Sequence, residues 1–458
     1  MSSRESRAAC WMAPRSSTPK LDAMRQRRSA RAFTLVELLT AMLAGALVSL
    51  AAFAFAKAAT TSFQEESRIS NATVSSTLGF RRLVSDLQRA SYMSSPNIQR
   101  DFRRPTVGDD ADPGTVCVDP AAYPLGIREL AGVVVEKDGY AITGTKSPAS
   151  ADNTTAPDRV TLAGNFPSSE QFWARRIVNG TDVYLEPNSG PVVRTAAQLA
   201  GSSGTWETIF KAGRILRVVD QTGFQHYGII ASAAFADGKP MVRLTNDTKL
   251  FQQGTGAIGS TNPACTGISG YGEGTLVNVI SRVRYEVRDL RNVAEYKSLY
   301  GDTSFGAATT TADVTGDDDR HELVRYEIDA TDGAPIAGTV ELIAEYAVDL
   351  RFGGTVATTV ANGTQLVQTL KRFAPGEDAT FYTAWARNPT ITPAQPGPER
   401  IRALQVRLAV RSRLPDRTEP LNLPGGALYR YKLANGKYAR VRSLQAEVAL
   451  SNQIGVFW

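Results

Sequence analysis

The sequence has very few of the side chains on which most hydrolytic, redox and zinc sites depend. Two of its 458 residues are histidines, His226 and His321, and three are cysteines. No HExxH, CxxC, GxSxG or phosphate-loop pattern occurs, although each of these chemistries needs fixed residue types at a fixed spacing. His226 stands in a strand-like segment, where a structural role is expected. The sequence therefore predicts a protein that is not an enzyme.

Outside its first 32 residues the sequence also lacks an excess of either charge. Lysine and arginine number 51 and aspartate and glutamate 45, a formal net charge of +6. Eight of the basic residues and two of the acidic ones precede residue 33, which leaves 43 of each sign in the remainder. Such a balance does not favour a basic groove that follows phosphates. The composition thus gives no indication of nucleic-acid binding.

A long apolar run follows the basic residues near the N-terminus. Glu37 is the only charge between Phe33 and Ala56, and the 19 residues from Leu38 to Ala56 are uncharged. As a helix they would be about 28 Å long, which matches a bilayer core of roughly 30 Å. We therefore expect a membrane-spanning helix with its basic flank in the cytoplasm and the rest of the chain exported. A cleaved secretory signal fits less well, because the run exceeds about 15 residues and no small-x-small site ends it.

Glu37 is the anomaly in this run. An ionised carboxylate in hydrocarbon costs on the order of a few kcal/mol unless it is paired. If the chain were cut between Ala32 and Phe33, the new α-amino group would supply a cation at that depth in a neighbouring copy of the helix. Glu37 would then serve assembly. The alternative is a side chain that reaches back to the headgroups on the cytoplasmic side.

The basic leader, Ala32 and the segment FTLVELL that follows it resemble the processing motif of type IV prepilins and type II secretion pseudopilins. In that family a prepilin peptidase cuts before the aromatic residue, the new N-terminus is methylated, and the glutamate pairs with the N-terminal amine of an adjacent subunit. The resemblance implies cleavage between Ala32 and Phe33, methylation of Phe33 and a subunit-assembly role for Glu37. Ala32 stands where the family usually has glycine. A start at Met24 instead of Met1 would give a leader of nine residues, the more usual family length.

The residues after the apolar run predict that the helix continues as an amphipathic stem. Four apolar residues recur at helical spacing, and the charged residues among them fall on other faces. These are Phe80, Leu83, Val84 and Leu87 on one face and Arg81, Arg82, Asp86 and Arg89 elsewhere. Pro96 is expected to end the helix. The predicted organisation is a leader, 1–32, a helix, 33–95, divided into a membrane part, 33–56, and a stem, 57–95, and a body, 96–458.

The body reads as β-strands joined by long polar loops. From Leu404 to Val410 apolar and other residues alternate, which is the period of a strand with one wet face. Asn435-Gly436, between two short strand-like runs, is a strong hairpin signal. Further strands are expected at 132–136, 159–163, 214–219, 227–232, 276–287, 323–328 and 340–352, and loops at about 104–122, 147–156, 188–205, 254–274, 300–320 and 387–399. The predicted fold class is α+β, a long N-terminal transmembrane and amphipathic α-helix packed on a large antiparallel β body, which is a pilin-like arrangement.

Short patterns in the body are similar to the PilW class of minor pilins. They are Leu87–Tyr92 at the stem end, Leu323–Glu327, Ile401–Arg411 and the closing Leu444–Asn452. The resemblance implies a structural and assembly subunit of a type IV pilus, which joins other minor pilins in a tip or priming complex. Its partners would be those minor pilins, the major pilin, the prepilin peptidase and a tip adhesin. It would reside in the inner membrane with a periplasmic body and then enter the extracellular filament, near the tip.

Two other functions are compatible with the sequence. The J-type pseudopilin of type II secretion is the nearest competitor and shares the processing motif. A single-span membrane protein, whose body is an adhesin or a ligand-binding module and never enters a filament, belongs to a different class. An intact leader would indicate this anchored module, whereas a methylated Phe33 would indicate a pilin.

The cysteines divide between compartments if the chain is processed in this way. Cys10 belongs to the leader, while Cys117 and Cys265 would face an oxidising space in which a disulfide persists. We therefore expect a Cys117–Cys265 bridge between two polar loops. Two buried, unpaired thiols are the alternative.

An acidic run carries the one candidate metal site in the sequence. Asp313, Thr315, Asp317 and Asp319 offer alternate oxygen atoms of the kind that Ca²⁺ binds, but the EF-hand pattern is absent. A solvated loop before the strand at 323–328 is the favoured interpretation. No cofactor is therefore expected apart from this candidate Ca²⁺ site.

Overall fold

The computed structural model divides into two units, with the boundary between Phe63 and Gln64. The described residues are 34–101, 103, 123–139, 149–168, 170–198, 206–219, 223, 225–236, 239–248, 250, 274–289, 320–362, 365–389, 397–413, 415, 430–433 and 436–454. Helix α1 (Leu35–Arg89) begins in the first unit and ends in the second. The remaining elements belong to the second unit, so the fold is α+β, with an N-terminal apolar helix and a large antiparallel β body.

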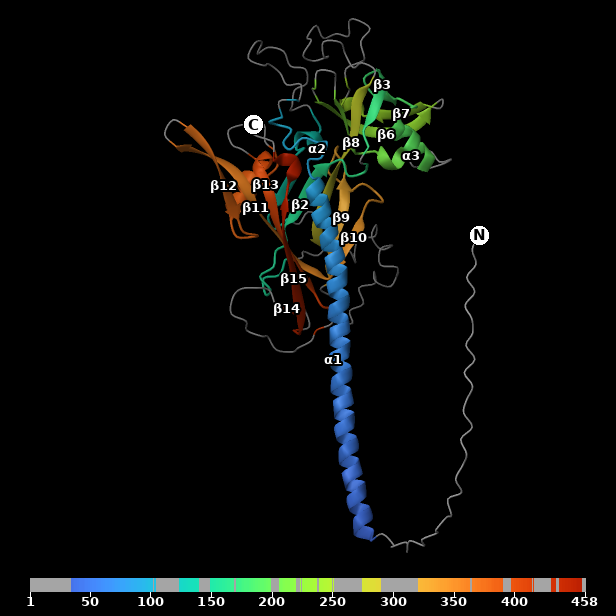
Figure 1. Ribbon diagram of the computed structural model, residues 1–458. Coiled ribbons are helices and arrows are strands. Elements are labelled where there is room, and N and C mark those ends of the chain that lie inside the picture. The colour runs from blue at the N-terminus through green and yellow to red at the C-terminus, as the bar shows by residue number, and fades with distance from the viewer. Residues whose placement is uncertain are drawn as a thin grey trace, which may run out of the picture. The chain divides into compact units, whose positions relative to one another are not determined.

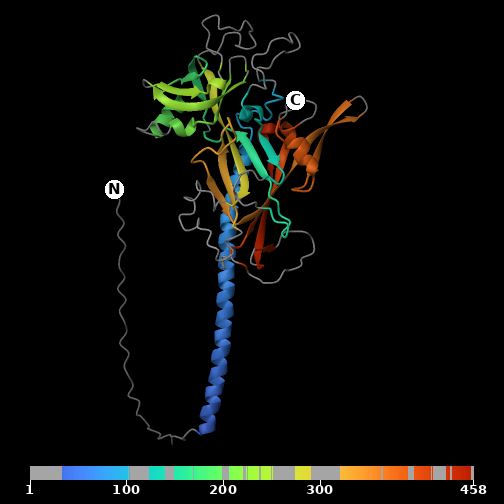
Figure 2. The same cartoon turned by 180° about the vertical axis from the view of Figure 1, so that it is seen from behind.

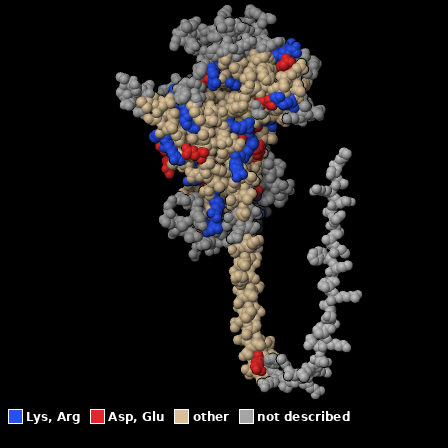
Figure 3. Space-filling model, in the orientation of Figure 1, with Lys and Arg blue, Asp and Glu red and all other residues tan. Residues whose placement is uncertain are grey.

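The first unit consists, in its described part, of the apolar portion of α1. The stretch Leu35–Thr60 has a mean hydropathy of 2.2 and is not buried by any other part of the chain. Its large apolar side chains between Leu35 and Phe55 are 57% to 80% exposed. On the face seen in Figure 3 this part of the helix shows charge only near its start. A helix that is apolar all round needs an apolar environment, and this one is long enough and apolar enough to span a membrane.

The helix ends earlier than the sequence predicts. α1 stops at Arg89 and not at residue 95, because the chain turns sharply through two left-handed residues, Ser91 (φ 63°) and Met93 (φ 52°). The Ser91 amide donates to the Ala163 carbonyl oxygen at 2.8 Å instead of extending the helix. A strand of the body therefore ends the helix before Pro96 does.

The predicted apolar face of the stem is confirmed. Phe80, Leu83 and Leu87 are buried and Val84 is half-buried at the edge of the same cluster. This cluster also contains core residues from both sheets described below, among them Leu162, Tyr285, Phe352, Leu404 and Val406. The end of α1 thus belongs to the main hydrophobic core.

The strands of the second unit form antiparallel sheets of ten and of five described strands (Figure 1). The first sheet contains β1 (Val133–Glu136), β2 (Arg159–Gly164), β3 (Phe172–Val178), β4 (Asp182–Leu185), β5 (Ile215–Val219), β6 (Gln225–Ala236), β7 (Lys239–Leu244), β8 (Thr275–Arg288), β9 (Glu322–Ile328) and β10 (Glu341–Glu345). The second contains β11 (Ala347–Asn362), β12 (Gln365–Phe373), β13 (Ile401–Arg411), β14 (Arg430–Lys432) and β15 (Tyr438–Ala449). The short helix α2 (Leu125–Arg128) precedes β1 in the chain, and the short helices α3 (Gly190–Gln198) and α4 (Trp206–Ile209) lie between β4 and β5.

Six strands of the first sheet close into a small barrel. β8 pairs with β3 on one side and β5 on the other, and β4, β7 and β6 complete the ring. The core of this barrel includes Phe172, Trp206 and Phe210, whose ring centroids lie 4.7 to 5.9 Å apart. Closure leaves no free sheet edge. Beyond Ile280, β8 leaves the barrel and pairs with β2 and β9 in an open sheet.

Most of the expected strands are confirmed. The pairing of β14 with β15 confirms the hairpin expected at Asn435-Gly436. Asn435 itself lies outside the described residues. Two expectations are wrong. The single strand at 340–352 is two strands, because Tyr346 (φ 55°) breaks it. The loop expected at 188–205 contains the helix α3. Strands β3, β4, β7 and β12 were not predicted.

Gly79 provides a test of how closely α1 packs on the body. A Cβ at this position would lie 2.3 Å from the carbonyl oxygen of Ile343 in β10, so the glycine permits the contact. Gly→Ala in a helix interior normally stabilises by up to about 1 kcal/mol, but Gly79→Ala should destabilise by roughly 1–3 kcal/mol through overpacking. Thermal unfolding of the full chain in detergent, followed by circular dichroism, measures the difference.

Gly45→Ala is the matched control, since nothing lies within 4 Å of a Cβ at that position. It should leave the melting temperature unchanged or raise it. A Gly79→Ala chain as stable as the Gly45→Ala chain would contradict the close approach of α1 to β10.

Candidate functional site

The start of α1 places Glu37 in a capping box. The backbone N–H and the Oγ1 hydroxyl of Thr34 donate to Glu37 Oε2 at 3.0 and 3.1 Å, and the Glu37 amide donates to Thr34 Oγ1 at 3.3 Å. This reciprocal pattern satisfies donors that the first turn of a helix leaves without partners. A carboxylate in the first turn also interacts favourably with the helix dipole.

The two carboxylate oxygens of Glu37 differ in what they contact. Oε2 accepts both hydrogen bonds from Thr34, whereas Oε1 has no hydrogen bond to any described residue. The cap involves no cation, so it leaves the charge of Glu37 uncompensated within the described residues. The site therefore holds the carboxylate in place and leaves one oxygen for another partner.

Sequence reasoning missed the cap, although its signal is present. Thr34-Leu35-Val36-Glu37 has the form [ST]-x-x-[DE] directly before an apolar run, which is the usual mark of a capping box. The sequence interpretation treated Glu37 as a residue that needs an external partner. The structure adds a local role within the same side chain.

The other predicted site residues lie outside the described residues. They are Ala32 and Phe33 at the expected cleavage point, Cys117 and Cys265 of the expected disulfide, and Asp313, Asp317 and Asp319 of the candidate Ca²⁺ site. In the part of the chain that the structure describes, no group of three or more His, Cys, Asp or Glu side chains could hold a metal ion. His226 is buried in β6, opposite Val218 of β5.

Asp86 is a second charged residue of α1 with an unexpected position. The sequence interpretation placed it away from the apolar face, and this is wrong, because its exposed fraction is 0%. The position follows Leu83 by three residues and precedes Leu87 by one, so it borders the buried stripe. The partners of Asp86 are residues of the body, which the helical pattern of α1 cannot reveal.

Two buried side chains of the body bind Asp86. The Tyr285 hydroxyl in β8 donates to Oδ2 at 2.7 Å, and Arg325 Nε in β9 donates to the same oxygen at 2.8 Å. Arg325 Nη1 also donates to Glu341 Oε1 in β10 at 2.9 Å, and Arg82 Nη2 lies 3.7 Å from Glu341 Oε2. The network ties the end of α1 to three adjacent strands.

The electrostatics of this cluster keep Tyr285 protonated. Burial of the phenol and the neighbouring Asp86 carboxylate both raise the pKa of Tyr285 well above its usual value, while the Arg325 guanidinium opposes them. The neutral hydroxyl is therefore available as a donor at any physiological pH. Within this cluster the neutral phenol and the charged guanidinium both donate to the buried carboxylate of Asp86.

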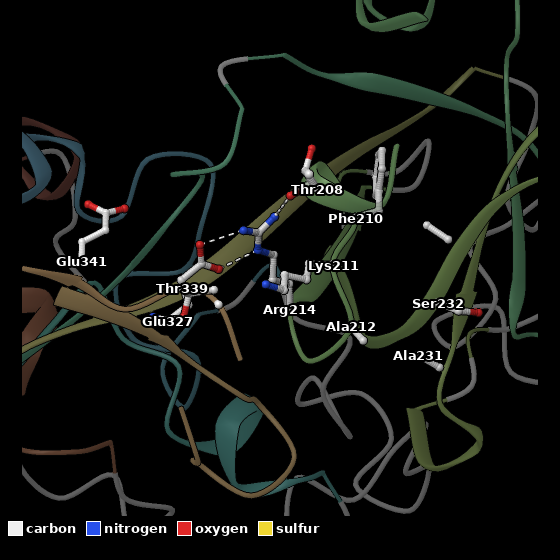
Figure 4. Close-up of a pocket in the computed structure, with 12 residues that line it drawn as sticks. Thr208, Phe210, Lys211, Ala212, Arg214, Ala231, Ser232, Glu327, Thr339 and Glu341 are labelled. Carbon is white, nitrogen blue, oxygen red and sulfur yellow. Dashed lines mark hydrogen bonds and ion pairs between the residues drawn. The ribbon is translucent and has the colours of Figure 1, made fainter. Parts of the chain in front are cut away.

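A cavity of about 680 Å³ lies beside the barrel and is lined in part by α4, β6 and β9 (Figure 4). Arg214 in its wall binds Glu327 through two hydrogen bonds of 2.6 and 2.7 Å, and its Nη1 donates to the carbonyl oxygens of Thr208 and Ile209. Lys211 Nζ donates to the Ala337 carbonyl oxygen at 2.6 Å. The described lining residues include no histidine or cysteine. Glu341, the remaining charged lining residue, accepts a hydrogen bond from Arg325 of β9.

Comparison with known proteins gives no relative. The chain matches no family model, and neither a curated protein nor a solved structure matches it.

The Asp86 network predicts a large effect of a small substitution. Asp86→Asn removes the charge that compensates Arg325 in a buried site, and loss of one partner of a buried ion pair costs about 3 kcal/mol. Thermal unfolding of the full chain in detergent should therefore show a clearly lower melting temperature.

Asp152→Asn is the matched control. It also removes an ion pair, the 2.8 Å contact between Asp152 and Lys432, but this pair lies on the exposed surface. Its melting temperature should stay close to that of the unsubstituted chain. Equal effects of the two substitutions would contradict the assignment of Asp86 as a buried anchor.

Proposed function

We propose that this chain is a minor pilin of the PilW class, a structural subunit that joins other minor pilins in a tip or priming complex and initiates assembly of a type IV pilus. The observation that carries the proposal is the state of Glu37. It stands at the start of a helix that is apolar all round, with one carboxylate oxygen fixed by Thr34 and the other without a hydrogen bond to a described residue.

The apolar helix supports the proposal because a pilin helix has an apolar environment both in the membrane, before assembly, and in the filament, after assembly. In the membrane the lipid chains surround the exposed side chains of Leu35–Thr60. In a filament the same side chains pack against the helices of neighbouring subunits. Helices that have left the lipid can only be stable together if each buried charge finds an opposite charge.

Cleavage between Ala32 and Phe33 would supply that opposite charge. The new α-amino group is a cation at neutral pH, and it would stand one residue before Thr34, close to the level of the capped carboxylate. In a bundle of staggered copies, Glu37 Oε1 of one subunit accepts from the amine of the next. The peptidase, the minor pilins and the major pilin are the partners that this scheme requires, and the filament tip is the place of the body.

The body supports a structural role in the same way. Its link to α1 includes buried apolar contacts and the Asp86 network. A subunit that is withdrawn from the membrane by its neighbours needs such a link between helix and body. The charged groups that line the cavity beside the barrel have partners within the body: Arg214 and Glu327 bind each other, Lys211 binds a carbonyl oxygen and Glu341 binds Arg325.

A pair of substitutions separates assembly from capping. Glu37→Gln keeps a residue that can complete the capping box but removes the charge, and loss of one partner of a buried charge pair should reduce incorporation into filaments by about tenfold or more. Thr34→Ala removes the cap, at a cost of about 1 kcal/mol, and keeps the charge. It should incorporate within a few-fold of the unsubstituted chain. Immunoblotting of sheared filaments measures both.

The opposite result, in which the Thr34→Ala chain is absent from filaments and the Glu37→Gln chain is incorporated into them, would show that Glu37 acts only as a helix cap. The proposed assembly role would then be wrong.

The N-terminus gives an independent test. Mass spectrometry of the chain from membranes should find a mature protein that begins at an N-methylated Phe33. A mature chain that still carries residues 1–32 would contradict the proposal and favour a single-span anchored module.

A further inference from the structure

The hairpin of β11 and β12 extends beyond the sheet to which it belongs. β11 pairs with β13 only as far as Val356, which lies opposite Ile401. From Ala357 to Asn362 it pairs with β12 alone, in register with Leu370 to Gln365. Figures 1 and 2 show these two strands reaching past β13. We call residues 357–362 and 365–370 the ribbon.

The ribbon lacks the features that normally protect an exposed strand edge. β12 is the last strand of its sheet and has no second partner among the described strands. From Phe352 to Leu370 the sequence contains no charged residue and no proline. Natural edge strands usually carry lysine, proline or a bulge that prevents pairing with another chain. Val367 and Leu370 are 40% and 70% exposed on this edge strand, and a two-stranded ribbon is by itself only marginally stable.

The sequence of β12 indicates which strand fits its edge. Residues 366–370 read Leu-Val-Gln-Thr-Leu, which is nearly the same in both directions. If a second copy of β12 pairs antiparallel about a two-fold axis at Gln368, leucine stands opposite leucine, the β-branched valine opposite the β-branched threonine, and glutamine opposite glutamine. Directly opposite side chains interact across a strand pair, and this register places no like charges opposite each other.

The charges at the base of β12 are compatible with this register. Lys371 would stand opposite Gln365 of the other copy and not opposite a second cation. Arg372 is already engaged in its own chain, where Nη2 lies 3.1 Å from Glu447 Oε2. A two-fold contact of this type is closed, because each edge is used once and no further copy can add.

We propose that two copies of this chain pair edge to edge through β12, antiparallel and with Gln368 of one copy opposite Gln368 of the other. The contact joins the two ribbons into a continuous sheet. It is an interaction of the β body that does not involve α1, and it does not rest on the proposed function.

A charge exchange at Gln368 tests the register. The full chain is prepared in detergent micelles with two different affinity tags, and co-purification of the second tag with the first measures pairing. Gln368→Lys in both copies, or Gln368→Glu in both, places like charges directly opposite, and each should reduce co-purification by up to about fivefold. A mixture of the Gln368→Lys and Gln368→Glu chains should restore it to at least the unsubstituted level.

Contacts between α1 helices in the micelle contribute equally to all these chains, because position 368 is not in α1. Recovery of co-purification in the mixture is therefore due to β12 alone. Ser443→Lys, at an exposed position of β15, is the control for an added lysine on a strand and should not change co-purification. Far-UV circular dichroism and melting temperature verify that each variant is folded. Unchanged co-purification in the single variants, or a loss in both that the mixture does not restore, would overturn the proposal.

Discussion

A helix that is apolar on every side and carries one carboxylate in its first turn constrains everything else about this chain. Leu35–Thr60 is unburied along its whole length and is long enough and apolar enough to span a membrane. In an apolar environment an ionised Glu37 needs a partner. The capping box with Thr34 satisfies one oxygen and sets the direction of the side chain, but it supplies no positive charge. The proposed assembly role of Glu37 follows from this uncompensated negative charge.

A second set of contacts attaches the large β body to this helix. Apolar contacts from Phe80, Leu83 and Leu87 provide the area, and Gly79 allows the backbone of α1 to approach β10. The Asp86 carboxylate fixes the register between helix and strands through Tyr285 and Arg325. Because a buried ion pair contributes more to specificity than to net stability in several known cases, we interpret this cluster as the determinant of a single docking position.

The sequence predicts those features that depend on neighbouring residues. The apolar stripe of the stem, the strand β13 and the β14–β15 hairpin follow from local patterns, and the structure confirms them. The wet face expected of β13 is wrong, because Gln405, Ala409 and Arg411 are buried in the body. The barrel was not predictable in this way, because β3 has a bulge between Ala174 and Arg176 that interrupts its alternation. Nothing local shows that β8 pairs with four different strands. The burial of Asp86 depends on residues about 200 and 240 positions away. The Cys117–Cys265 disulfide and the Ca²⁺ site stay predictions.

The contact between subunits can be measured directly. Carbodiimide treatment of filaments forms an amide only where an amine and a carboxylate are already in contact, and mass spectrometry identifies the joined peptides. The account predicts a link between Glu37 of this chain and the N-terminal amine of a neighbouring subunit. Filaments that contain the chain but give no such link, or link Glu37 only to other groups, would contradict it.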